Sequence, residues 1–253
     1  MKRLFVFAIL SLTLTLLLNC QQNDKSNNSI SANVLPEDTV VVASPGYGEN
    51  IFENKYVKLI KVSLAPGEAF PSHQVPTGAV YALSDAKLEL KKDDLKSYID
   101  EMFKNHTYWQ DSTVMSIKNI GNNKAEYLEV IRKESALPEN LFDYYLAMEE
   151  DTHQETTSEK TAVFENDRIR VLEVSLVPGN PNIPGNTTQR DRGLAKLIYP
   201  LSPCNLKYYD NSEKNQTEKS FRAGEAFWDA AGPQKFHNIG SANAQFLIFE
   251  FKE

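Results

Sequence analysis

The chain has 253 residues, and its 34 acidic residues outnumber its 27 basic ones, which gives a formal net charge of −7 at pH 7. An acidic chain of this kind is a poor partner for nucleic acid or for the surface of an anionic membrane. The chain also has only two cysteines, which excludes a disulfide framework.

The first twenty residues, MKRLFVFAILSLTLTLLLNC, have the pattern of a secretory signal. A basic start precedes an apolar run over residues 4–18, which is shorter than the roughly 18 to 20 residues of a membrane-spanning helix. Residues 17–20 resemble a bacterial lipobox, with Asn19 in place of the commoner Gly, Ala or Ser. The resemblance implies a signal peptide over residues 1–19, a lipidated Cys20 and a location at the bacterial cell envelope. The alternative is an ordinary signal peptide followed by an incidental cysteine.

Residues 20–37 are polar and contain little to bury, so we interpret them as a flexible tether. A lipidated Cys20 would anchor the chain to the membrane through buried acyl carbons. The remaining cysteine, Cys204, has no intrachain partner, and we interpret it as a small buried hydrophobic residue.

An internal repeat sets the architecture. FENKYVKLIKVSLAPG, residues 52–67, recurs as FENDRIRVLEVSLVPG, residues 164–179. WQDSTVMSIKNIGNNKAEYLEV, from Trp109, likewise aligns with WDAAGPQKFHNIGSANAQFLIF, from Trp228. Two units with the same internal order are therefore predicted, and the recurring tryptophans indicate packing in both.

Both units are predicted to be all-β. In the second copy apolar and polar residues alternate as they do in a strand, but the phase slips by one residue at Val171 and Leu172. The first copy slips at the equivalent Leu59 and Ile60. Because such a slip turns the apolar set to the other face unless the strand bulges, we predict a β-bulge at both places.

Turns and two further elements complete the prediction. Pro-Gly at 66–67 and 178–179 ends each of these strands, and Asn-Ile-Gly at 119–121 and 238–240 precedes each final strand. Helical spacing of Leu95, Tyr98, Ile99, Met102 and Phe103 predicts a short helix. The corresponding part of the second unit, DNSEKNQTEKSFRAGE, predicts a hairpin with a polar tip, and PENLFDYYLAMEED, from residue 138, predicts a second short helix or an ordered linker.

The repeated FEN and Pro-Gly motifs, the turn before a tryptophan in RAGEAFW, and Asn-Ile-Gly before the last strand resemble the cupin superfamily. The resemblance covers residues 38–133 and 155–253, joined by a linker or short helix over 134–154. It implies a bicupin: two tandem double-stranded β-helix barrels of the jelly-roll kind, with a natural small-molecule site at the barrel mouth.

Metal-binding members of this superfamily place His-x-His and a Glu after Pro-Gly and a third His before the Asn, a set suited to Mn, Fe, Ni or Zn. In the first unit only His73 matches. Val75 stands at the second position, Ala79 and Val80 in the region of the Glu, and Met115 at the third His.

In the second unit Gly185, Thr187 and Gln234 stand at the ligand positions, and His237 lies one residue before the Asn, where strand alternation points it elsewhere. The sequence therefore predicts no metal site and no cofactor in either barrel. A site built differently, for example from His73, Met115 and an outside carboxylate, is the alternative.

The candidates for a ligand pocket are His73, Tyr81, Met115, Arg190, Arg192 and Gln234. For His73 the other interpretation is a hydrogen-bonded barrel or loop histidine, and for the loop that carries the two arginines it is a solvated loop. An anionic ligand at a barrel mouth is what those arginines would meet.

Three functions remain open. The first, which we favour, is a metal-free lipoprotein module that binds a small molecule or an envelope protein. The second is an enzyme with an atypical site around His73. It would be either a metal-dependent enzyme with unorthodox ligands, such as a dioxygenase, or a metal-free isomerase or epimerase in which His73 and Tyr81 supply an acid and a base. The third is a purely structural or interaction role, which barrels filled by aromatic side chains would favour.

Overall fold

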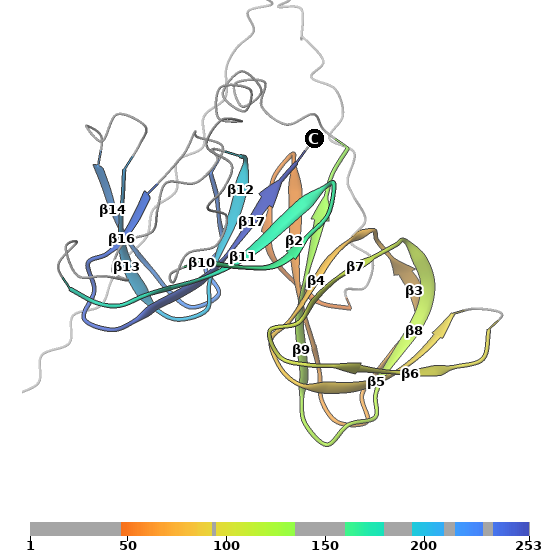
Figure 1. Ribbon diagram of the computed structural model, residues 1–253. Coiled ribbons are helices and arrows are strands. Elements are labelled where there is room, and N and C mark those ends of the chain that lie inside the picture. The colour runs from red at the N-terminus through yellow and green to blue at the C-terminus, as the bar shows by residue number, and fades with distance from the viewer. Residues whose placement is uncertain are drawn as a thin grey trace, which may run out of the picture. The chain divides into compact units, whose positions relative to one another are not determined.

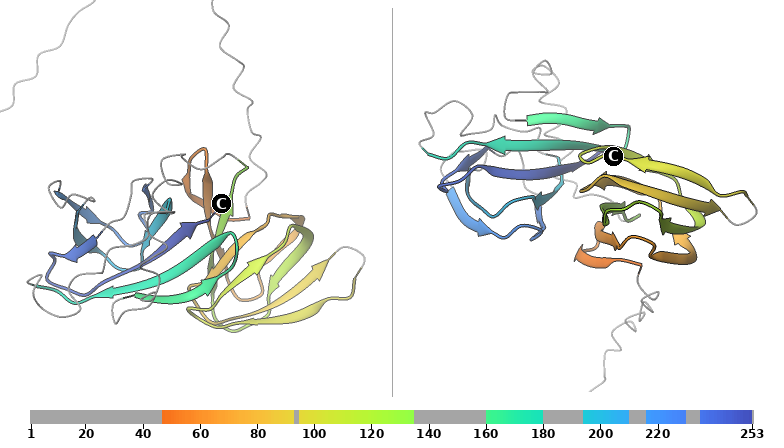
Figure 2. Two further views of the ribbon diagram at one scale, coloured as in Figure 1. Left: turned by 45° about the horizontal axis from the view of Figure 1, so that its top comes forward. Right: turned by 90° about the horizontal axis from the view of Figure 1, so that it is seen from below.

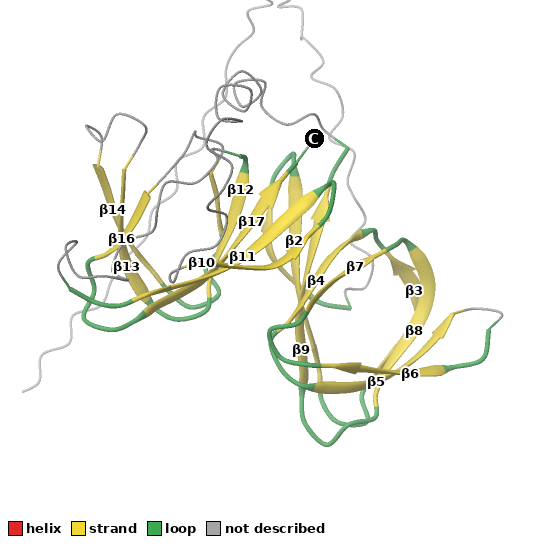
Figure 3. Cartoon of the chain, viewed as in Figure 1, coloured by secondary structure: helices red, strands yellow, loops and turns green. Residues whose placement is uncertain are grey.

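The computed structural model describes residues 47–92, 95–134, 160–179, 194–209, 216–229 and 235–252. Within these ranges the chain is all-β: seventeen strands are joined by turns and loops (Figure 3). No helix long and apolar enough to cross a membrane occurs within the described ranges.

The first barrel is built from two sheets, in the orders β1-β2-β9-β4-β7 and β3-β8-β5-β6. Figure 1 shows β3 and β8 on the side of the barrel opposite β4 and β9. Its nine strands are β1 (Glu49–Glu53), β2 (Val57–Leu64), β3 (Ala69–Val75), β4 (Gly78–Ala82), β5 (Ala86–Lys92), β6 (Tyr98–Met102), β7 (Thr107–Gln110), β8 (Thr113–Asn119) and β9 (Ala125–Arg132).

The second barrel repeats this order, with sheets β10-β11-β17-β12-β15 and β14-β13-β16. The long strands β11 and β17 run antiparallel and side by side (Figure 2). Its strands are β10 (Lys160–Glu165), β11 (Ile169–Leu176), β12 (Lys196–Pro200), β13 (Cys204–Tyr209), β14 (Gln216–Phe221), β15 (Phe227–Asp229), β16 (Lys235–Asn238) and β17 (Ala244–Phe251).

The predicted Pro-Gly turn is present after β2. The Glu68 N–H donates to the Ala65 carbonyl at 3.0 Å, and Gly67 has a φ of 80°. This geometry fits a turn with Pro at the second position and Gly at the third, since the third position needs a positive φ. Gly179, after β11, also has a positive φ, of 117°.

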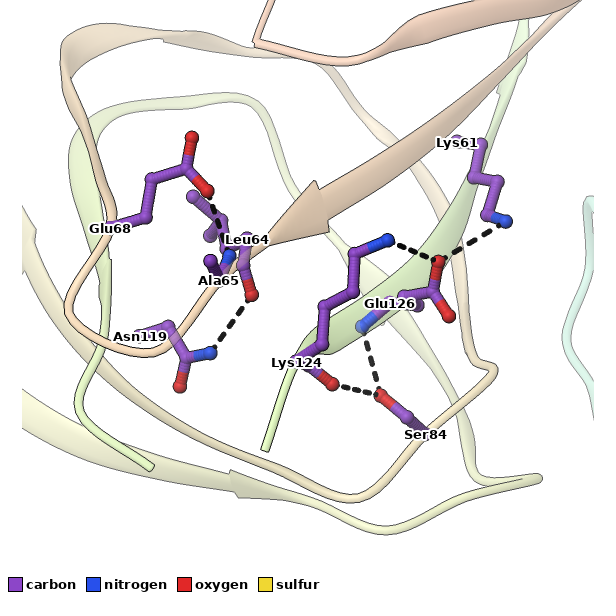
Figure 4. A network of polar contacts seen from close by, with 8 residues as sticks. All are labelled: Lys61, Leu64, Ala65, Glu68, Ser84, Asn119, Lys124 and Glu126. Carbon is purple, nitrogen blue, oxygen red and sulfur yellow. Dashed lines mark hydrogen bonds and ion pairs between the residues drawn. The ribbon is translucent and has the colours of Figure 1, made fainter. Parts of the chain in front are cut away.

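The Asn-Ile-Gly motif ties the end of each barrel together through its asparagine, and Figure 4 shows the bond from Asn119 to Leu64 in the first barrel. The Asn119 amide is buried and donates to the Leu64 carbonyl at 2.9 Å and to the Asn123 carbonyl at 2.8 Å, while its oxygen accepts from the Gly121 N–H at 2.9 Å. Asn238 makes the same three bonds in the second barrel, at 3.0, 2.8 and 2.9 Å. A buried amide that is satisfied in this way fixes both turns relative to each other.

The helix predicted from residue 95 to residue 103 is wrong. Tyr98–Met102 is strand β6, which pairs antiparallel with β5 from Ala86↔Met102 to Leu90↔Tyr98. Of the apolar residues at helical spacing only Met102 is buried; Leu95, Ile99 and Phe103 are about 60% exposed, so no core required the helical face. The hairpin predicted at the corresponding place in the second barrel is confirmed by the pairing of β13 with β14. The second predicted helix, around residue 138, lies outside the described residues.

One core cluster contains residues from the five-stranded sheets of both barrels. In β2, Val57 and Leu59 belong to this shared cluster, whereas Ile60, Val62 and Leu64 belong to the interior of the first barrel. In β11 the change falls in the same place: Ile169 and Val171 belong to the shared cluster, and Leu172, Val174 and Leu176 to the interior of the second barrel. The slip in the alternation therefore marks the point along the strand where the buried side changes. Before it the apolar side chains face the shared cluster outside the barrel, and after it they face the barrel interior.

The predicted bulges occur opposite the residues where the alternation slips, but in the neighbouring strands β1 and β10. β2 pairs with β9 without interruption, while β1 shifts its register between Asn50 and Phe52, opposite Ile60 and Leu59. In the second barrel β10 shifts between Ala162 and Phe164, opposite Leu172 and Val171. Placing the bulge inside β2 and β11 was wrong, because burial on both faces already explains their pattern.

The two tryptophans of the repeat pack against the shared cluster. Trp228 stacks on the ring of Tyr56, with centroids 5.3 Å apart, and the guanidinium of Arg168 lies 5.8 Å from the centroid of the Trp109 ring. Each tryptophan thus meets a residue of the other barrel, and the two contacts are equivalent in the repeat.

Candidate functional site

The interior of the first barrel contains a buried carboxyl group, Glu129 on β9. Its neighbours Leu128 and Val130 face the shared cluster, so strand alternation turns Glu129 into the barrel. Glu129 is 3% exposed and accepts a hydrogen bond from the Tyr47 hydroxyl. Burial raises the pKa of Glu129 to about 7, and the hydrogen bond from Tyr47 opposes the rise.

Three tyrosines surround this carboxyl group. Burial is the main cause that raises the pKa values of Tyr47, Tyr108 and Tyr127, and the charge of Glu129 raises all three further. Tyr127 belongs to the interior cluster, and partly buried Tyr47 and Tyr108 pack against it. Glu129 therefore lies among aromatic rings, and no other described residue forms an ion pair or hydrogen bond with it.

His73 faces the same interior. It pairs in register with Met115, which belongs to the interior cluster, and directly opposite residues of antiparallel strands share a face. The His73 ring lies 4.2 Å from the Tyr47 ring, and its Nδ1 lies 2.8 Å from the Pro71 carbonyl oxygen. Its Nε2 is buried without a hydrogen-bond partner.

The residues present do not fit the metal site of the superfamily. Val75, at the second histidine position, is fully buried in the interior cluster and offers no lone pair, and Met115 is 4% exposed beside His73. In the described part of the chain no group of three His, Cys, Asp or Glu residues could hold a metal ion. One imidazole, one thioether and the single carboxyl group of Glu129 do not make the set of three imidazoles and a carboxylate that binds Mn, Fe, Ni or Zn in this superfamily.

The acid–base pair proposed for the enzyme alternative, His73 with Tyr81, is not brought together. Tyr81 on β4 belongs to the shared cluster between the barrels, whereas its neighbour Val80 faces the first barrel's interior. The Tyr81 hydroxyl lies 2.6 Å from Glu173 Oε1 and 3.1 Å from Asn105 Oδ1, at a cleft of about 400 Å³. Tyr81 and His73 thus belong to opposite faces of the barrel wall.

The interior of the second barrel is lined differently at the equivalent positions. Phe227 pairs with Ile198 as Tyr108 pairs with Val80, and Ile248 stands where Glu129 stands. Phe246 likewise stands in place of Tyr127. The interior cluster of the second barrel is accordingly built mainly from phenylalanine and aliphatic side chains, together with Cys204, and Tyr208 packs against it.

The buried charges of the second barrel occur with opposite signs close together. Arg170 Nη1 lies 3.7 Å from Glu250 Oε2, and Arg170 Nε lies 3.5 Å from Glu165 Oε2. Arg170 and Glu250 are 3% and 1% exposed, and the fully buried Lys196 pairs in register with Glu250. In such pairs each charge offsets part of the cost of burying the other. Glu129 in the first barrel has no opposite charge of this kind among the described residues.

The remaining candidates are placed as follows. His237 follows Phe236, a residue of the second interior cluster, so it faces away from that interior, and its Nε2 lies 3.2 Å from the Gly179 carbonyl oxygen. Cys204 is buried, and burial raises the pKa of its thiol to about 11, which leaves it a poor nucleophile at neutral pH. The other candidates lie outside the described residues: Cys20, Arg190, Arg192 and Gln234.

Sequence reasoning missed Tyr47 and Glu129. A signal for Glu129 was present, because the final strands AEYLEVI and AQFLIFEF align with Glu129 opposite Ile248, at a position that alternation turns inward. Tyr47 precedes the first repeated motif, and no pattern assigned it to the interior.

No known sequence family matches the chain, and no curated protein sequence matches it either. Solved structures do match. A variant of the Bacillus subtilis oxalate decarboxylase shares 14% identity with a TM-score of 0.52, over 79% of this chain and 70% of that one. The formate complex of the Lactobacillus farciminis oxalate decarboxylase shares 11% identity with a TM-score of 0.53, over 79% of this chain and 78% of that one.

At these identities the likeness shows the fold alone. The class that the fold defines is the bicupin, a protein of two jelly-roll barrels in tandem. This chain has the bicupin fold that the resemblance of its repeated motifs implied.

Proposed function

We propose that this chain is a lipid-anchored bicupin module at the bacterial cell envelope that binds a small molecule in its first barrel without a metal ion. The lipobox-like sequence before Cys20 and the polar tether over residues 20–37 support the setting, and the bicupin fold supports a cupin-type module. The observation that carries the proposal is that the interior of the first barrel holds a buried carboxyl group and a buried imidazole nitrogen without a charged partner among the described residues.

Three side chains meet in this interior. Tyr47 links the other two, because its hydroxyl bonds to the Glu129 carboxyl and its ring lies against His73. Burying a carboxyl group and an imidazole nitrogen without full compensation is unfavourable for folding. A bound molecule would supply the missing partners, and this is the usual property of a binding pocket with a few convergent polar groups.

The metal-free part of the proposal is tested by elemental analysis of the chain from Gln21 onward, after incubation with Mn, Fe, Ni and Zn. We expect less than about a tenth of an equivalent of metal after desalting, because the described donors cannot complete a ligand set. Near-stoichiometric metal that is lost in His73→Ala would contradict the proposal.

The anchor is tested in a bacterial host that processes lipoproteins, by following the full chain with a radiolabelled fatty acid. We expect the wild-type chain to carry the label and to be found in the membrane fraction. The Cys20→Ala variant should be unlabelled and absent from the membrane fraction. Cys204→Ala is the matched control, since Cys204 is buried within the second barrel. An unlabelled wild-type chain would show an ordinary signal peptide instead.

An enzyme is the second candidate, and one observation favours it. Burial raises the pKa of Glu129 to about 7, where a carboxyl group can both accept and donate a proton at neutral pH. Such an enzyme would use Glu129 with Tyr47 or His73, in place of the pair of His73 and Tyr81. Turnover of a bound ligand by the wild-type chain, lost in Glu129→Gln while binding is kept, would favour the enzyme over the binding module.

A further inference from the structure

We propose that the first barrel selects a small organic cation, a protonated amine, which pairs with the Glu129 carboxylate inside a wall of aromatic rings and donates an N–H to His73. This inference rests on the proposed function, that the interior of the first barrel is a small-molecule site. It adds the chemical class of the ligand, and it excludes small carboxylates such as those in the structural neighbours' names.

The charge of the interior gives the first argument. Glu129 is the buried acidic residue of the first barrel, and its only described partner is the neutral Tyr47 hydroxyl. The nearby acid Glu126, on the same strand, points to the outer face, where its Oε1 pairs with Lys61 at 3.2 Å and Lys124 at 3.1 Å. The interior thus lacks the counter-charge that the exterior has, and a cationic ligand would supply it.

The aromatic wall gives the second argument. Tyr47 bonds to Glu129, Tyr127 lies two residues from it on the same face of β9, and Tyr108 pairs with Val80, which itself pairs with Glu129. Phe70 packs edge-on against Tyr47 with centroids 5.8 Å apart. Aromatic faces attract ammonium groups, and they attract them more strongly where water is excluded. The second barrel has phenylalanine rings but Ile248 in place of the carboxylate, so it lacks half of this arrangement.

His73 gives the third argument, which concerns hydrogen bonding. A carbonyl oxygen only accepts, so the contact with Pro71 places the His73 proton on Nδ1. In the neutral ring Nε2 is then an acceptor, and this atom is buried without a partner. The ligand therefore needs a donor as well as a positive charge. A protonated amine has both, whereas a quaternary ammonium has charge without N–H and an alcohol has a donor without charge.

The experiment uses the chain from Gln21 onward and four matched series with methyl, butyl and benzyl skeletons: primary amines, trimethylammonium compounds, alcohols and carboxylates. Saturation-transfer NMR and calorimetric titration at millimolar ligand give the affinities. We expect amines to bind at least tenfold more tightly than the other three series. We also expect amine affinity to rise as the pH increases through about 7 and to level off above it, because the ligand pairs with the ionised Glu129 carboxyl.

Variants separate the contributions. Glu129→Gln should abolish the amine preference and the pH dependence while the fold stays intact, and the matched Glu126→Gln, on the outer face of the same strand, should change neither. Tyr108→Phe should retain the amine preference, because the ring rather than the hydroxyl forms the wall.

The outcomes distinguish this inference from the proposed function. Carboxylates or alcohols that bind best, and that are lost on changing His73 or Tyr47, would overturn the amine while the small-molecule site stands. Trimethylammonium compounds that bind as tightly as the amines would overturn the N–H contact to His73, and with it the choice of a protonated amine. An absence of binding in all four series would overturn both the inference and the proposed site.

Discussion

The interiors of the two barrels occupy equivalent positions of one repeat and differ in their polar groups. In the first barrel Glu129, Tyr108 and Tyr127 line the interior; Ile248, Phe227 and Phe246 take their places in the second. The second barrel does bury charges, but Arg170 and Glu250 lie 3.7 Å apart with opposite signs.

This difference separates two uses of a buried charge. An ion pair that is formed within the protein can be part of a stable wall, although it contributes little net stability. A buried carboxyl group without a counter-charge is unfavourable for the folded chain, and features of that kind are concentrated at functional sites. The first barrel is therefore the part of the molecule in which we place the ligand, and the second provides a packing partner through the shared cluster.

The largest effect on stability is expected when a glutamate is placed in the second barrel at Ile248, the position equivalent to Glu129. In Ile248→Glu the new carboxyl would pair in register with two aliphatic residues, Leu172 and Ile198, on the same face as the existing acid Glu250. We expect the free energy of unfolding to fall by at least about 4 kcal/mol at pH 8, because an unpaired charge is moved out of water. Urea denaturation measures the loss.

The matched control is Gln245→Glu, which places an acid on the exposed side of the same strand. That variant should change the free energy of unfolding by less than about 0.5 kcal/mol. If Ile248→Glu were equally mild, the two interiors would be interchangeable and the assignment of the site to the first barrel would lose its basis.

The reverse change in the first barrel, Glu129→Gln, should stabilise the protein at high pH. Burial raises the pKa of Glu129 from 4.5 to about 7, which corresponds to about 3 kcal/mol. Well below pH 4.5 the carboxyl is protonated in both the folded and the unfolded chain, and the penalty for burying a charge is absent. Above pH 7 it is ionised in both, and the folded chain bears the full penalty, so wild-type stability falls as the pH rises between these values.

Glu129→Gln removes this dependence because an amide does not ionise. We expect the variant to be more stable than the wild type by up to about 3 kcal/mol at pH 8 and equal to it at pH 4. Urea denaturation at a series of pH values measures the difference, with Glu126→Gln as the control on the outer face. A constant difference between the two chains across the pH range would show that Glu129 keeps an ordinary pKa.

Much of this architecture could be read from the sequence, because the repeat preserved the residues that the fold requires. The Asn-Ile-Gly motif recurs because the asparagine amide bridges two turns in both barrels, and the Pro-Gly motif recurs because Gly67 and Gly179 need a positive φ. The helix prediction failed where this kind of support was missing. Leu95, Ile99 and Phe103 had helical spacing without a core to face, and strand pairing with β5 decided the structure.

The site was harder to predict because it depends on which face a residue occupies. Tyr81 was grouped with His73, although alternation in β4 sends it to the shared cluster. The phase slip at Leu59 and Ile60 was interpreted as a bulge within β2, although it records packing of β2 against the other barrel. Knowing that the outer faces of the two five-stranded sheets are buried would have corrected both, but a single sequence does not say that the barrels pack together.

A smaller loss of stability, of equal size in the two barrels, is expected at the asparagines that make the same hydrogen bonds in both. Asn119→Ala and Asn238→Ala each remove two amide donors and one acceptor from the same three backbone groups. We expect each variant to lose about 2 kcal/mol of unfolding free energy, because buried carbonyl groups are left without partners. Urea denaturation should give losses within about 0.5 kcal/mol of each other, given the equal geometry.

Asn123→Ala is the control for the first barrel, since only the backbone of this exposed residue joins the network. Its unfolding free energy should stay close to that of the wild type. A loss confined to one of the two buried asparagines would show that the barrels differ in their turns as well as in their interiors.

The smallest effect is expected from Tyr47→Phe, which removes the hydroxyl that bonds to Glu129 and keeps the ring. This hydrogen bond stabilises the ionised carboxylate and so lowers the pKa of Glu129, against the larger effect of burial. Without it the pKa should rise above 7, and the pH at which stability stops falling should move up with it. At pH 8 we expect a loss of about 1 to 2 kcal/mol, since hydrogen bonds to charged groups contribute in this range. At pH 4 the carboxyl is neutral, and the loss should be smaller.

Unfolding by urea across the same pH series measures both the loss and the shift of its midpoint. Tyr98→Phe, on the exposed strand β6, is the control for removing a hydroxyl from a tyrosine. A Tyr47→Phe loss that is the same at pH 4 and pH 8 would mean that the hydroxyl contributes packing alone. The Tyr47 hydroxyl would then not stabilise the ionised Glu129, and a ligand alone would have to supply a partner for this carboxylate.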